Sequence, residues 1–133
     1  MVMSKTTIIS GFVILIGLAA NALAVDRDWT NAGGDRLWRT AANWSGAACP
    51  NSLDKAAIRN QAILGPIIDS STIAVVNEIV VGDWGSTADT LDMTGGSLTV
   101  SQWFSLGYYI QNNGTFTMSA GTVTIGSFMY VGN

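Results

Sequence analysis

The sequence predicts an all-β fold, a parallel β-solenoid in which the chain winds into stacked coils of 25 residues. Three observations lead to this prediction. The segments 91–108 and 116–133 align without a gap, which places Leu98 above Val123, 25 positions later. Within each segment apolar side chains alternate with small polar ones, which is the period of a half-buried strand. Turn-forming runs such as Gly95-Gly96 separate the strands, so each repeat is one short unit of strands and corners.

Successive coils of such a solenoid lie about 4.8 Å apart, so equivalent residues stack into columns. We expect buried columns at 73/98/123, 75/100/125, 79/104/129, 81/106/131 and 93/118. A solvent-facing column is expected to contain Ala74, Thr99 and Thr124. Glycine recurs at one corner of each coil, at positions 82, 107 and 132. A left-handed or crowded backbone is expected at that corner. A β-sandwich is the alternative architecture.

The first 24 residues have the features of a secretory signal peptide. Lys5 supplies a positive charge, residues 8–20 are mostly apolar, and Ala22-Leu23-Ala24 offers small residues before a cleavage site after Ala24. The apolar stretch is shorter than the ~20 residues that a membrane-spanning helix needs. We therefore expect an exported protein, secreted or at the cell surface, with no transmembrane span after cleavage. An uncleaved anchor is the alternative.

Residues 25–54 are predicted to form an N-terminal, tryptophan-rich cap, and residues 55–133 to form about three coils. The repeats within the coils are expected at about 66–90, 91–115 and 116–133. Trp29, Trp38 and Trp44 fall within the cap and need burial. A first coil without a cap would expose strand edges and an apolar cross-section, which the three rings would cover. The alternative is that these rings line a sugar-binding groove.

Composition excludes several functions. Loss of Lys5 with the leader changes the formal net charge from -3 to about -4, and an acidic chain without a basic run does not suit nucleic acid. The chain has no histidine, which excludes the usual serine and cysteine triads and histidine-based metal sites. We expect no cofactor. The single cysteine, Cys49, leaves no internal disulfide and is expected to be a small buried residue beside Pro50, with intermolecular pairing as the alternative.

Grouped carboxylates are the remaining basis for catalysis, because parallel β-helices also host polysaccharide lyases and hydrolases. Asp69, Asp83, Asp89 and Asp92 fall at different phases of the repeat, so no two of them are expected to stack as a catalytic or calcium-binding pair. No lysine or arginine follows Arg59. We therefore expect a protein that is not an enzyme, with no catalytic residue and no metal site.

A set of cap and strand residues carries a family resemblance. The set comprises Trp29, Trp38, Asn43, Trp44, Ser45, Pro50, Asp54, Ala57 and Ile58. Together with the recurring rungs, these residues resemble the N-terminal region of exported bacterial β-solenoid surface proteins of the autotransporter-like and PEP-CTERM-sorted type. The resemblance implies a structural or adhesive protein of the cell surface. Such proteins usually continue through many more coils, so we expect this sequence to be truncated at its C-terminus.

Aromatic side chains at outward phases are the candidate contact residues for a ligand or partner. The candidates are Trp84, Trp103, Tyr108, Tyr109, Phe128 and Tyr130. Rings beside neutral hydrogen-bonding groups suit sugars, which present apolar faces rimmed by hydroxyls, although rings that only protect the strands are the structural alternative.

The function expected from these observations is a non-catalytic exported surface protein that acts in adhesion or as a scaffold. Its expected partners are glycans, other surface proteins, or further copies bound through the open C-terminal coil. A carbohydrate-binding module is the first alternative, and a fragment of a polysaccharide-degrading β-helix enzyme is the second.

Overall fold

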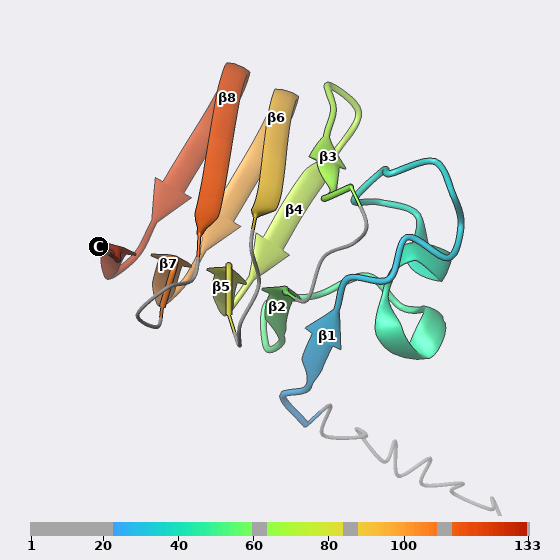
Figure 1. Cartoon of the computed structure of the whole chain (residues 1–133), viewed down its shortest axis with the longest axis horizontal. Helices are drawn as coiled ribbons and strands as arrows, with labels where there is room; N and C mark the ends of the chain where they lie inside the picture. The colour runs from blue at the N-terminus through green and yellow to red at the C-terminus, as the bar shows by residue number, and fades with distance from the viewer. Residues whose placement is uncertain (1–22, 60–63, 84–87, 109–112, 133) are drawn as a thin grey trace, which may run out of the picture.

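The computed structural model in Figure 1 describes residues 23–59, 64–83, 88–108 and 113–132. The strands, in chain order, are β1 (Asp26–Asp28), β2 (Lys55–Ile58), β3 (Ile67–Ile68), β4 (Ile73–Val76), β5 (Glu78–Val81), β6 (Asp89–Val100), β7 (Trp103–Leu106), β8 (Gly114–Ile125) and β9 (Phe128–Val131). The predicted signal peptide lies outside the described residues except for Leu23 and Ala24.

The strands form two parallel sheets that lie side by side (Figure 1). One sheet has the order β1-β2-β5-β7-β9, and in the other β6 pairs with β3, β4 and β8. Every pairing between named strands is parallel, so the chain goes round once between neighbours of a sheet and makes about four turns. This confirms the parallel β-solenoid, and the β-sandwich alternative is wrong.

Inward-facing side chains of successive coils stack into apolar ladders. Leu98 is the direct partner of Val123, as the sequence repeat predicts. Ile79, Phe104 and Met129 also stack in register. Ile79, Leu98 and Phe104 are completely buried and belong to one continuous core. Burial of each such side chain contributes about 1.5–3 kcal/mol to folding, so the ladders are the main source of stability.

Strand β4 corrects one part of the predicted register. Ala74, not Ile73, pairs with Leu98, an offset of 24 positions instead of 25. Ala74 is therefore buried, whereas Ile73 and Val75 face outward with exposed fractions of 82% and 36%. The solvent-facing column is Val75, Thr99 and Thr124, so the predictions for Ile73, Ala74 and Val75 were wrong.

Two one-residue differences cause this local shift and then cancel. Residues 69–72 form a tight turn in which the Thr72 N–H donates to the Asp69 carbonyl oxygen at 3.0 Å. This turn uses one residue more than the equivalent bend in β6. The corner after β4 is one residue shorter than the corner after β6, so Ile79 again pairs with Phe104 at an offset of 25.

Glycine makes the bend of β6 compatible with the turn beneath it. Gly96 has φ of 68°, and a Cβ atom at this position would overlap the carbonyl oxygens of Asp69 and Thr72. At the repeated corner, Gly82 and Gly107 have φ of 79° and 65°, which confirms the predicted left-handed backbone at these two positions. Gly132 is not left-handed, but its backbone is crowded, because a Cβ atom there would overlap the Gly107 carbonyl oxygen.

The segment between β1 and β2 covers one end of the stack. It contains two 3-10 turns, η1 (Ala41–Asn43) and η2 (Ser45–Ala47). Elsewhere too, no helix in the described part of the chain is long and apolar enough to cross a membrane. The ring centroids of Trp29 and Trp38 lie 5.1 Å and 4.7 Å from the ring centroid of Trp44, and both pairs pack edge to face. All three rings are 2–3% exposed, so the alternative that they line a sugar-binding groove is wrong.

Indole nitrogens and one thiol in this segment contact backbone oxygens. Trp44 Nε1 donates to the Trp38 carbonyl at 2.7 Å, and Trp29 Nε1 donates to the Leu64 carbonyl at 3.0 Å, which satisfies two buried polar groups. Cys49 is half-buried, with its Sγ 3.5 Å from the Trp38 oxygen, and burial raises the pKa of its thiol.

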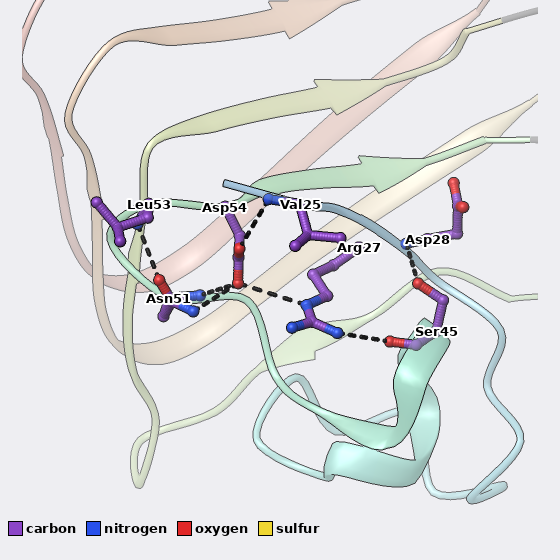
Figure 2. Close-up of polar contacts among 7 residues, drawn as sticks. All are labelled: Val25, Arg27, Asp28, Ser45, Asn51, Leu53 and Asp54. Carbon is purple, nitrogen blue, oxygen red and sulfur yellow. Dashed lines mark hydrogen bonds and ion pairs between the residues drawn. The ribbon is translucent and has the colours of Figure 1, made fainter. Parts of the chain in front are cut away.

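The buried carboxylate of Asp54 joins β1 and the residue before it to the first full coil (Figure 2). Its Oδ1 accepts from the Val25 N–H at 3.1 Å, and its Oδ2 accepts from Asn51 Nδ2 at 2.6 Å and from Arg27 Nε at 3.4 Å. Arg27 also donates to the carbonyl oxygen of Ser45 at 3.2 Å. The carboxylate thus holds β1, η2 and the start of β2 in one register.

The bend in β6 makes a testable prediction about glycine. Gly96→Ala is expected to lower the free energy of unfolding by about 3 kcal/mol or more, because the new Cβ combines a left-handed backbone with overlap against two carbonyls. Gly34→Ala is the matched control, since Gly34 has φ of 79° but no atom lies within 4 Å of the place its new methyl group would take. The control is expected to lose only about 1–2 kcal/mol. Chemical denaturation followed by circular dichroism measures both values, and equal losses would contradict the packing argument.

Candidate functional site

The outer face of the β1-β2-β5-β7-β9 sheet carries two columns of side chains, because alternate residues of each strand point outward. The first column contains Asp26, Lys55, Glu78, Trp103 and Phe128. The second contains Asp28, Ala57, Val80, Ser105 and Tyr130. A third group follows the carboxyl ends of β2, β5 and β7 and contains Arg59, Asp83 and Tyr108. Across β2, β5 and β7, large side chains therefore stand on both sides of small ones.

This arrangement creates a hollow of about 390 Å³. Val80 and Ser105 lie on its floor. One wall is formed by Lys55, Glu78 and Trp103, and the other by Arg59, Asp83 and Tyr108. The volume falls within the range of about 300–1,000 Å³ that is typical of small-molecule sites.

Ion pairs order the charged half of the hollow. Lys55 Nζ lies 2.7 Å from Asp26 Oδ2. Arg59 Nη2 lies 2.7 Å from Asp28 Oδ1, and Arg59 Nη1 lies 3.6 Å from Asp83 Oδ2. The Asp26 and Asp28 side chains are 48% and 43% exposed, so their pairs contribute at most about 1 kcal/mol to stability. Their effect on the site is to position the two cations beside the hollow.

Asp83 differs from Asp26 and Asp28, the other carboxylates in these ion pairs, because it is buried. The residue is only 6% exposed, and its Oδ1 accepts no hydrogen bond although that atom is inaccessible to solvent. Leaving a buried polar atom without a partner costs about 1–3 kcal/mol, and more for a charged group. The wall of the hollow therefore contains a hydrogen-bond acceptor that the described residues do not satisfy.

Four of the six predicted contact residues lie together at the β7–β9 side of this face. We call Trp103, Tyr108, Phe128 and Tyr130 the contact face. The rings of Trp103 and Phe128 are stacked, with centroids 5.4 Å apart and planes at 26°. Those of Tyr108 and Tyr130 are 6.1 Å apart at 63°. The four residues are 41–53% exposed, so the rings present apolar surface to solvent.

The other two predicted contact residues, Trp84 and Tyr109, lie outside the described residues.

The charged residues of the hollow were missed because their spacing differs from the 25-residue period. Lys55 lies 29 positions after Asp26 and 23 before Glu78, so a gapless alignment of the repeats does not bring them together. Arg59 and Asp83 are likewise 24 positions apart. One sequence signal could have found them. Lys55, Glu78 and Trp103 each precede a small outward residue by two positions, and these small residues are Ala57, Val80 and Ser105.

The site has the groups for binding by hydrogen bonds and ring stacking. Its charged half offers carboxylate acceptors and cationic donors, and its aromatic half offers flat apolar surface. Within the described ranges, no three side chains of the acidic, cysteine or histidine type gather closely enough to hold a metal ion.

No protein-family model matches this sequence, and comparisons with curated proteins and with solved structures find no significant match.

The contact between Arg59 and Asp83 makes a prediction about stability. Arg59→Met is expected to lower the free energy of unfolding by about 1–3 kcal/mol, because it leaves the buried Asp83 carboxylate without its cation. In a double-mutant cycle, Arg59→Met should cost less in the background of Asp83→Asn, which has no charge to compensate. Urea denaturation of the four proteins measures this coupling. Additive losses would mean that the two groups do not interact.

Proposed function

We propose that this chain is a non-catalytic, exported surface protein, a rigid β-solenoid that acts in adhesion or as a scaffold through its contact face. The observation that carries the proposal is the pair of ring contacts on β7 and β9, Trp103 with Phe128 and Tyr108 with Tyr130. Exposed aromatic side chains held on a sheet supply large contact area with little loss of side-chain entropy on binding. Because the rings repeat from coil to coil, a longer stack would present several such contacts to one partner.

The parallel stack supports a mechanical role. Each coil is joined to the next by backbone hydrogen bonds along two sheets and by the apolar ladders between them. Equivalent positions therefore keep a constant spacing along the axis. Together with the apolar leader at residues 8–20, which is the basis for proposing export, this architecture suits a surface-exposed spacer.

A carbohydrate-binding module is the second candidate function. The hollow next to Trp103 favours it, because a ring beside buried and exposed hydrogen-bonding groups can hold one face of a sugar and its hydroxyls.

Loss of two rings should abolish adhesion if the contact face is responsible. Beads that display residues 25–133 are tested under shear flow on wells coated with polysaccharide, with protein, or with the same chain. Phe128→Ala/Tyr130→Ala is expected to reduce bead retention at least about tenfold on the surface that holds the wild type, since interface hot spots are typically aromatic and contribute about 2 kcal/mol or more.

Ile73→Ala serves as the control for this experiment, because Ile73 is 82% exposed on β4, away from the contact face. It should leave retention unchanged. Equal retention of the wild type and the double variant, with both proteins folded by circular dichroism, would contradict the proposal.

Self-association through the last coil is the proposed route to scaffold formation. Met118, Met129 and Val131 occupy inward columns yet are 43–66% exposed, because in the described chain no further coil covers them. Strands β8 and β9 each pair with one strand there, so they offer edges for further parallel pairing.

The isolated chain, residues 25–133, is therefore expected to associate as its concentration rises. Static light scattering should show an increase in apparent mass, and Met129→Lys/Val131→Lys should suppress it by placing charge on the apolar cross-section. Ile73→Lys adds a charge away from this end and should leave association unchanged. A wild-type chain that stays monomeric at high concentration would contradict this route.

A further inference from the structure

We propose that the hollow between Trp103 and Asp83 is a subsite for one neutral hexopyranose unit of a polysaccharide. The inference rests on the proposed contact function and deepens it by naming a ligand class and the residues that recognise it. It combines the shape of the hollow, the ring at its wall, the unsatisfied carboxylate oxygen and the charge of the lining.

The size of the hollow suits a single sugar ring. The hollow lies above Val80 and Ser105, where large side chains are absent, and its walls rise at Trp103 on one side and Asp83 on the other. Trp103 is 41% exposed and already stacks on Phe128 with its planes nearly parallel, at 26°. A pyranose has apolar C–H faces that pack on an indole, so the ring wall orients the sugar.

The carboxylate of Asp83 supplies the specific polar contact. Its Oδ2 faces Arg59 at 3.6 Å, while its buried Oδ1 accepts no hydrogen bond. A buried acceptor of this kind requires an O–H or N–H donor. That oxygen is closed to solvent in this structure, so the carboxylate must turn to bring it to the hollow. A sugar hydroxyl there would then satisfy it with a charge-assisted hydrogen bond, which is stronger than a neutral one.

The charge of the lining selects among saccharides. Three carboxylates, of Asp26, Glu78 and Asp83, face two cations, of Lys55 and Arg59. The cations already contact carboxylates, Lys55 at 2.7 Å from Asp26 and Arg59 at 2.7 Å from Asp28. A uronate or sulfated sugar would add negative charge next to Asp83 and be repelled. Neutral hexoses, which bring only hydroxyls, fit the site.

Affinity gel electrophoresis tests this assignment with three probes. Residues 25–133 are run in native gels containing hydroxyethylcellulose, galactomannan or polygalacturonate. At least one of the two neutral polymers is expected to retard the wild type, and polygalacturonate is expected to retard it less. Retardation by neither neutral polymer, or stronger retardation by polygalacturonate, would overturn the inference.

Two variants locate the binding in the hollow. Asp83→Asn should weaken the binding measured by retardation at least about tenfold. The amide oxygen of the new side chain will face Arg59, so its NH₂ group, a donor, will take the place of the acceptor Oδ1. Val80→Phe should fill the floor and weaken it similarly, without touching the core, because Val80 points outward between the buried Ile79 and Val81. Asp92→Asn is the control, since Asp92 lies on β6 of the other sheet, where it forms an ion pair with Arg36. Thermal unfolding confirms that each variant is folded.

The two proposals fail in different ways. If Asp83→Asn and Val80→Phe bind the neutral polymer like the wild type while Phe128→Ala/Tyr130→Ala loses bead retention, the sugar subsite is wrong and the contact function stands. If Phe128→Ala/Tyr130→Ala retains beads like the wild type, the contact function itself is wrong.

Discussion

Parallel backbone pairing between successive coils is the constraint on which the rest of the structure depends. Where Leu98 pairs with Val123 and Ile79 with Phe104, the neighbouring side chains of the same strands have fixed partners in the adjacent coil. Apolar residues must then meet apolar residues for the interior to exclude water. The same register places Trp103 on Phe128 on the outside, so the core and the contact face follow from one set of hydrogen bonds.

The architecture could be predicted because the repeat records this constraint directly. The alignment of Leu98 with Val123 and the period-two alternation were sufficient for a parallel solenoid. The position of β4 could not be predicted in the same way. The turn at 69–72 and the short corner after Val76 differ from their equivalents by one residue each and cancel, so a gapless alignment across them keeps its offset while Ala74 and Val75 exchange faces.

The candidate site was predictable only in its aromatic half. Trp103 and Phe128 belong to coils of equal length, so their stacking follows from the 25-residue repeat. Lys55 and Arg59 belong to the coil that follows the cap, where the spacing to the next coil is 23 or 24 residues. Their approach to Glu78 and Asp83 depends on the length of a corner, which composition and alternation do not encode. The unsatisfied oxygen of Asp83 is a property of three-dimensional packing, which no sequence pattern records.

The alternation of inward and outward residues in β5 and β7 separates two structural roles. Ile79 and Phe104 determine whether the coils stay together, whereas Val80 and Ser105, one position later, determine the depth of the surface between them. Val80 is only partly buried, so its substitution can change this surface with little effect on folding, whereas Ser105 is 3% exposed and has less freedom to change. A β-solenoid built this way can change the shape of its outer surface one residue per coil while the residues that stack inside it stay the same.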